Sequence, residues 1–272
     1  MARIAILQMT SGIDPEANFE TIRGAVADAA GGGAEMLFTP EMSLMLDRDR
    51  ARAAGHIEVN GGHFPARLAS LAGEYGLHLA IGSMAVATSA GKWANRTYLF
   101  APGGGPGYVT YDKIHMFDVD LANGESWRES NAYEAGSTVV VADDTPVGKL
   151  GLTICYDLRF PALFGDLGDR RCDTIAVPAA FTVPTGRAHW HVLLRARAIE
   201  ASAFVIAAAQ VGKHEDGRET YGHSLVIDPW GEVLLDMGGK EPGLGFAEID
   251  LSRIAEVRAQ VPSLANRREI AK

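Results

Sequence analysis

The sequence contains little cysteine, no long apolar run and no excess of positive charge. Cys155 and Cys172 are its only cysteines among 272 residues, too few for a disulfide framework, and we expect both to be free thiols. No apolar run approaches the roughly 18 residues that span a bilayer. A net charge of −9 would on average repel nucleic acid and anionic membranes, so we predict that neither is a partner.

The sequence also lacks a Ser/Pro-rich or charged linker and the pattern of a secretory signal. With 272 residues, 47% of them hydrophobic, the chain can bury a large core. We therefore predict a single domain over residues 1–272. Residues 1–8 lead directly into a strand-like run, without the apolar core and small-residue cleavage site of a signal peptide, which favours a cytoplasmic location.

Strand-like and helix-like segments alternate along the chain, which predicts a layered α/β fold. Apolar residues at helical spacing predict helices over 15–30, 64–75 and 187–203. Two hairpins are expected, one around the Gly-rich turn 102–107 and one at 228–231, so the sheets should be mixed. Strand-like runs occur at 4–8, 36–38, 78–81, 97–100, 138–141, 150–154, 174–177, 205–210, 224–227 and 245–249.

Cys155 lies where the strand-like run 150–154 stops and a new helical pattern begins near Pro161. A strand that breaks sharply at a cysteine holds the sulfur away from the backbone, close to main-chain N–H groups that can receive a developing oxyanion. The N–H of Tyr156 is the expected donor. Cysteine is also a common core residue, so position alone leaves both a nucleophile and a core filler open.

Three charged residues occupy positions from which they can reach such a nucleophile. Glu41 follows a strand that Pro40 ends, Lys113 follows the run 108–112, and Glu129 lies in a polar loop that leads back toward Cys155. Catalytic groups of α/β folds gather at strand ends, although charged residues there are often only solvated. In acyl transfer Glu41 would move protons, Lys113 would stabilise the oxyanion and favour the thiolate, and Glu129 would steady Lys113 or the substrate amide.

These four residues resemble the catalytic set of the nitrilase superfamily of carbon–nitrogen hydrolases. The resemblance spans essentially the whole chain and is strongest to the Nit branch. It implies a four-layer α-β-β-α sandwich with two mixed sheets, and a homodimer or larger homo-oligomer with the helix near 187–203 as a candidate interface. The motifs that carry it lie at 113–120, 155–161, 180–190, 193–200 and 228–231.

The resemblance further implies amide hydrolysis through a cysteine thioester, since Tyr156-Asp157 follows the nucleophile where nitrilases usually have Trp-Glu. Similar members hydrolyse deaminated glutathione or the ω-amide of a 2-oxo acid. By the same analogy Arg159 binds the substrate carboxylate, and bidentate pairing suits that role. The other residues expected to line the pocket are Phe181, Thr182 and Thr185, although the threonines would also suit helix capping and Phe181 a core position.

Several alternatives remain open at this point. Within the superfamily, N-carbamoyl amide hydrolysis is the second candidate reaction. A Cys-His peptidase or thioesterase would use His115 or His223 as its base, and a non-catalytic scaffold would use only its dimer surface. His189 and His191 are two residues apart and point to different faces of a helix, and no metal-binding motif is present, so we predict neither a metal nor another cofactor.

Overall fold

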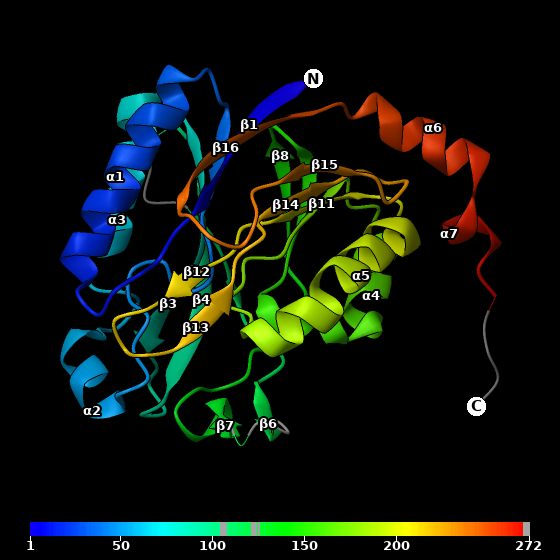
Figure 1. The fold of residues 1–272 in the computed structure, drawn as a ribbon. Coiled ribbons are helices and arrows are strands. Elements are labelled where there is room, and N and C mark those ends of the chain that lie inside the picture. Colours follow the sequence, from blue (N-terminus) through cyan, green and yellow to red (C-terminus); the bar gives the residue numbers. More distant parts are fainter. Residues whose placement is uncertain (104–107, 121–123, 125, 269–272) are drawn as a thin grey trace.

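The fold consists of two mixed β-sheets packed face to face between two pairs of helices (Figure 1). The computed structural model describes residues 1–103, 108–120, 124 and 126–268. Helices α1 (Pro15–Gly31) and α3 (Phe64–Tyr75) cover the outer face of the first sheet, and α4 (Pro161–Asp169) and α5 (Val183–Ala201) cover that of the second. This arrangement is the α-β-β-α sandwich that the family resemblance implies.

Each sheet has six strands within the described residues. The first has the order β16 (Gly243–Ile249), β1 (Ala2–Gln8), β2 (Met36–Phe38), β3 (His78–Ala87), β4 (Trp93–Phe100), β5 (Tyr108–Asp112). The second has the order β15 (Val233–Asp236), β14 (Leu225–Ile227), β11 (Phe204–Ala207), β10 (Thr174–Ala176), β9 (Gly148–Leu152), β8 (Val141–Thr145).

Smaller elements surround this frame. Two short hairpins pair β6 with β7 and β12 with β13, and the last two helices follow β16. Their bounds, with the remaining short helices, are α2 (Arg50–Ala53), η1 (Ala54–His56), β6 (Asp118–Asp120), β7 (Ser126–Arg128), η2 (Glu129–Asn131), η3 (Cys155–Arg159), β12 (Val211–Lys213), β13 (Glu219–Tyr221), α6 (Ser252–Gln260) and α7 (Ser263–Asn266).

Strand periodicity explains how the first sheet joins two cores. On β1, Ile4 and Ile6 belong to the cluster that lies between the sheets, whereas Ala5 and Leu7 belong to the cluster under α1 and α3. Successive side chains point to opposite faces of a strand, so a strand covered on both faces is apolar at every position. The same pattern occurs on β11, where all four residues are apolar and buried.

The two predicted hairpins and the mixed sheets are confirmed. Strands β4 and β5 pair antiparallel, as do β14 and β15, while β1, β2 and β3 run parallel. Part of the Gly-rich turn, residues 104–107, lies outside the described residues. Among the helices that the structure describes, none is long and apolar enough to cross a membrane.

Several predicted boundaries are wrong: β3 and β4 are longer than the strands expected over 78–81 and 97–100, and the strand expected over 205–210 ends at Ala207. The strand expected over 138–141 instead begins at Val141 and runs to Thr145, because the tight turn from Thr145 to Gly148 fixes the pairing of β8 with β9. Val139 and Val140 still pack against the core as partly buried side chains. Helix α5 begins at Val183 rather than near 187. Pro184 lies in its first turn, where a backbone N–H would have no hydrogen-bond partner, so the proline does not interrupt the helix there.

Candidate active site

Cys155 begins the short helix η3 immediately after β9, as the sequence predicts for a residue on a turn. Its φ is +49°, a left-handed conformation that is uncommon for a residue with a side chain. The turn is held by a hydrogen bond from the Cys155 N–H to the Pro178 carbonyl at 2.8 Å, and by one from the Ile154 N–H to Asp157 at 2.9 Å. These bonds fix the direction of the thiol.

Glu41 lies just beyond β2 and is almost completely buried, with 5% of its surface exposed. Its Oε2 accepts a hydrogen bond from the Ala180 N–H at 2.9 Å, and its Oε1 accepts from Asn95 Nδ2 at 2.9 Å. The charge of this carboxylate acts on the Cys155 thiol, and both residues line the same cavity. Glu41 is therefore placed to accept the proton that a cysteine nucleophile must lose.

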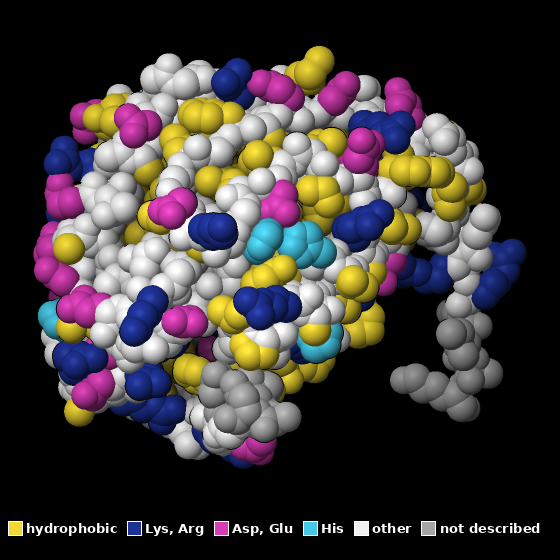
Figure 2. Space-filling view, viewed as in Figure 1, with side chains coloured by type: hydrophobic (Ala, Val, Ile, Leu, Met, Phe, Trp, Pro, Cys, Tyr) yellow, Lys and Arg dark blue, Asp and Glu magenta, His cyan; other side chains and the backbone are white. Residues whose placement is uncertain are grey.

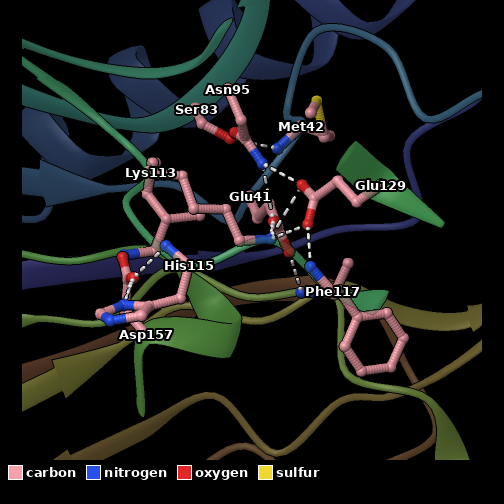
Figure 3. A network of polar contacts seen from close by, with 12 residues as sticks. Glu41, Met42, Ser83, Asn95, Lys113, His115, Phe117, Glu129 and Asp157 are labelled. Carbon is pink, nitrogen blue, oxygen red and sulfur yellow. Dashed lines mark hydrogen bonds and ion pairs between the residues drawn. The ribbon is translucent and has the colours of Figure 1, made fainter. Parts of the chain in front are cut away.

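Lys113 follows β5 and lies between two carboxylates (Figure 3). It is 2% exposed, and its Nζ is 3.0 Å from Glu41 Oε1 and 3.0 and 2.9 Å from the two oxygens of Glu129. Glu129 is itself oriented by the Phe117 N–H, which donates to its Oε2 at 2.6 Å. The structure thus brings together all four residues that the sequence singles out.

The charges of this cluster determine the protonation of its members. Burial opposes the charge of Lys113, but the carboxylates of Glu129 and Glu41 outweigh it and raise the pKa of Lys113 well above its usual value. Burial and the charge of Glu41 raise the pKa of Cys155, and Lys113 opposes this only in part. Lys113 favours the thiolate, as expected, but burial and the charge of Glu41 outweigh it, so the resting cysteine is a thiol.

A cavity of about 1040 Å³ opens onto this cluster. Its lining includes Cys155, Glu41, Lys113 and Glu129, and also the five residues predicted to bind substrate: Tyr156, Arg159, Phe181, Thr182 and Thr185. The cavity is at the upper end of the usual range for small-molecule sites, roughly 300 to 1,000 Å³. It can hold a ligand considerably longer than a five-carbon amide.

A family model described as carbon-nitrogen hydrolase matches residues 3–259. The chain belongs to the carbon–nitrogen hydrolase family. Deaminated glutathione amidase of Synechocystis sp. (strain PCC 6803 / GT-S) is 40% identical, covering 97% of each chain. The enzyme of the same name from Yersinia enterocolitica is 38% identical, covering 99% of this chain and 94% of that protein.

The fold of this carbon–nitrogen hydrolase also matches a solved structure. The C. elegans NitFhit protein superposes with a TM-score of 0.90 at 34% identity, covering 98% of this chain and 65% of that longer chain. The family resemblance and the nitrilase-like fold predicted from the sequence are confirmed.

Arg159 and its neighbours form one wall of the hydrolase cavity. The Arg159 guanidinium lies 5.7 Å from the centre of the Tyr156 ring and 5.3 Å from that of Phe181, and its Nη1 is 3.1 Å from His189 Nδ1. No carboxylate pairs with it among the described residues. A cation that lines a cavity without an acidic partner suits an anionic ligand.

The two threonines of the wall contact each other. Their hydroxyl oxygens, on Thr182 and Thr185, are 2.8 Å apart. Thr182 occupies the N-cap position of α5, but its side chain makes no capping hydrogen bond to the backbone. Phe181 packs on Trp190, with ring centres 4.7 Å apart, so it serves the core and the cavity together.

Two polar residues of the site were missed by sequence reasoning. Asn95, in the middle of β4, donates to both Glu41 and Glu129, which joins the two carboxylates on either side of Lys113. Asp157 is fully buried and accepts from the Tyr111 hydroxyl at 2.6 Å, while His115 Nδ1 lies 2.6 Å from its other oxygen. Two features of the sequence could have indicated this network: Asp157 stands two residues after Cys155, and Tyr111, Lys113 and His115 are spaced two residues apart.

This second network ties β5 and the segment after it, which bears Lys113, to the turn that bears Cys155. Tyr111 and His115 stand on either side of Lys113 in the sequence, and Asp157 is two residues past Cys155. Burial and the charge of Asp157 raise the pKa of Tyr111, so the phenol remains a donor. Asp157 therefore fixes the position of the lysine relative to the sulfur.

The histidines required by a Cys-His enzyme are engaged elsewhere. His115 is bound to Asp157 and stacks on Phe160 at 3.6 Å, and His223 is bound to Asp236. Neither lines the cavity that contains Cys155. The carboxylate of Glu41, rather than an imidazole, is the base within reach of the thiol.

Proposed function

We propose that this carbon–nitrogen hydrolase cleaves an amide through a thioester on Cys155. The observation that carries the proposal is the buried ion pair of Glu41 with Lys113 beside the Cys155 thiol, with all three residues lining a large cavity. A buried carboxylate beside a thiol serves as a general base, and a fixed ammonium group serves as an electrostatic stabiliser. Glu129 and Asn95 support the proposal because they hold these groups in place.

The first half-reaction follows from this arrangement. Glu41 takes the thiol proton as the sulfur attacks the carbonyl carbon, so a C–S bond forms and the carbonyl electrons move to oxygen. Protonation removes the charge of Glu41, which frees a Lys113 N–H to bind the oxyanion together with the Tyr156 N–H. Glu41 then gives its proton to the leaving nitrogen, and the C–N bond breaks.

The second half-reaction uses the same base. Glu41 takes a proton from water as the water oxygen attacks the thioester carbon. The C–S bond breaks, the carboxylic acid leaves, and the sulfur recovers its proton from Glu41. Since Glu129 holds Lys113 through both of its oxygens, its role is to position the ammonium group.

We propose deaminated glutathione as the substrate. The two relatives at 38% and 40% identity carry that name, and the cavity of about 1040 Å³ accommodates a tripeptide-sized molecule. Cleavage would release 2-oxoglutarate and the dipeptide. A panel of deaminated glutathione, 2-oxoglutaramate, simple amides, N-carbamoyl amino acids and nitriles tests this assignment. Deaminated glutathione should show the highest kcat/KM, and faster turnover of an N-carbamoyl amino acid or a nitrile would overturn it.

Arg159 is proposed to bind the 2-oxo acid carboxylate. The Arg159→Met variant should lower kcat/KM for 2-oxoglutaramate by about 10- to 100-fold, because charge-assisted hydrogen bonds contribute about 1.5 to 3 kcal/mol. The matched measurement uses an unsubstituted aliphatic amide of the same chain length. Its slower turnover should be unchanged in the variant, and an equal loss for both amides would show that Arg159 acts in some way other than by binding the carboxylate.

We also propose that the protein forms a homodimer through α5 and the β14–β15 hairpin, and that it acts in the cytoplasm, where its thiols stay reduced. The two elements meet where Arg195 Nε donates to the Gly231 carbonyl at 2.7 Å. Together they present large apolar side chains to solvent, the usual mark of an interaction surface. These are Val192, Ile199, Trp230, Val233 and Leu234.

A charge in this surface should disrupt the dimer. Val192 is 68% exposed, so Val192→Asp should leave the fold intact, yet an unpaired carboxylate would be buried on association. Sedimentation velocity should show a monomer for this variant and a dimer for the parent protein. The control is Val59→Asp, at an equally exposed valine outside the surface, which should remain dimeric. A Val192→Asp variant that remains dimeric would rule out this face.

A further inference from the structure

Three potential metal ligands that lie far apart in the sequence meet on the surface of the molecule. His191 belongs to α5, His223 precedes β14, and Asp236 ends β15. They form the one group of at least three His, Cys, Asp or Glu side chains in the described parts of the chain with ligand atoms within 4.8 Å of one another. Figure 2 shows histidine side chains next to an acidic one on this face. None of the three lines the catalytic cavity.

The distances within the group are close to those of a tetrahedral ligand set. His191 Nε2 is 3.1 Å from Asp236 Oδ2, and His223 Nδ1 is 2.9 and 3.1 Å from the two Asp236 oxygens. Ligands about 2.0 to 2.1 Å from a zinc ion are about 3.4 Å apart in a tetrahedron. The imidazole ring centres are 4.9 Å apart, and each ring directs one nitrogen at the Asp236 carboxylate.

Surrounding contacts hold the ligands in place. The Gly238 N–H donates to Asp236 Oδ1 at 2.8 Å, and the His223 N–H donates to the Gly238 carbonyl at 2.8 Å. His223 has a φ of +55°, and its carbonyl accepts from Trp190 Nε1 at 2.8 Å. Supporting bonds of this kind orient metal ligands and strengthen binding. The side chains are 25 to 34% exposed in the single chain, which leaves a path for an ion from solvent before two chains associate.

We propose that His191, His223 and Asp236 form a binding site for a divalent transition-metal ion of the zinc class. Two imidazole nitrogens and one carboxylate oxygen suit Zn²⁺, whereas Ca²⁺ and Mg²⁺ prefer oxygen ligands alone. Water fills the fourth position. One ligand comes from α5, and the other two lie at the open end of the β14–β15 hairpin, just before β14 and at the end of β15. A bound ion therefore joins the helix to the hairpin and stabilises the folded state.

The test is a calorimetric titration of chelator-treated protein with Zn²⁺, performed in the Cys155→Ala background so that the catalytic thiol cannot bind the metal. We expect one equivalent per chain and at least an approximately tenfold weaker affinity after His191→Ala or His223→Ala. The control His56→Ala removes an exposed histidine elsewhere and should bind as the parent does. No binding, or equal binding by all variants, would overturn the site.

A thermal measurement gives a second readout that does not depend on calorimetry. Zn²⁺ should raise the unfolding midpoint of the parent and not that of the His191→Ala variant. In an otherwise unchanged chain, both His191→Ala and chelator treatment should leave amide hydrolysis intact. Hydrolysis lost on chelation would contradict the separation of this site from Cys155, whereas failure of the substrate panel would leave the metal site untouched.

Discussion

The Cys155→Ala variant is expected to hydrolyse deaminated glutathione at least about 10⁴-fold more slowly than the parent protein, because removal of a nucleophile leaves only the binding and electrostatic contributions. Substrate affinity should change little, since the sulfur contributes little to binding in the ground state. Steady-state kinetics with detection of 2-oxoglutarate measures kcat, and calorimetry on the inactive variant measures substrate binding.

Cys172 provides the matched control for this variant. It is the other free cysteine and is fully buried, between α4 and the second sheet. Cys172→Ala should therefore lower stability slightly and leave kcat unchanged. A kcat within tenfold of the parent value for Cys155→Ala would exclude the thioester mechanism.

The Lys113→Ala variant should lose both activity and stability. Loss of one oxyanion donor lowers kcat by about 10² to 10³-fold. Removal of this ammonium also leaves Glu41 and Glu129 buried without their counter-ion, and breaking a buried ion pair in this way destabilises a protein by about 3 to 5 kcal/mol. Initial rates and urea unfolding measure the two effects separately.

Two further variants identify the cause of these losses. Lys113→Met keeps most of the apolar stem and removes the charge, so it should lose the same factor in kcat even where it folds better than Lys113→Ala. Lys149→Ala removes a half-exposed lysine whose Nζ is 3.4 Å from Asp143, and it should change stability by less than about 1 kcal/mol without affecting kcat. A Lys113→Met enzyme of nearly full activity would refute the oxyanion role.

Much of the active site was accessible from the sequence because its members stand at strand ends. Glu41 and Lys113 each follow a strand, and Cys155 follows another, so their side chains gather at one edge of the sandwich. Asn95 was not predictable, because it lies in the middle of β4 and its direction depends on the irregular pairing of β3 with β4 between Ile81 and Met84. A shift in register reverses the face on which a side chain lies.

The protonation of the thiol and the proposed metal site also required the structure. A nearby lysine favours the thiolate, as the sequence predicts, but only the spatial arrangement shows that deep burial and the carboxylate of Glu41 outweigh it. His191, His223 and Asp236 are brought together by the packing of α5 on the hairpin. The spacing of these three residues along the sequence does not indicate a metal site. His189 and His191 are only two residues apart, but they lie on different faces of the helix.

The most direct test of the thioester mechanism is to follow alkylation of the two cysteines by iodoacetamide at neutral pH, with peptide mass spectrometry and residual activity measured on the same samples. Burial raises the pKa of both thiols, so the expected difference comes from access and from a neighbouring base: Cys155 lines the cavity beside Glu41, whereas Cys172 is fully buried and does not line this cavity. Activity should fall in proportion to modification of Cys155, substrate should protect it, and Cys172 should react much more slowly. Full activity in protein completely alkylated at Cys155 would contradict the mechanism.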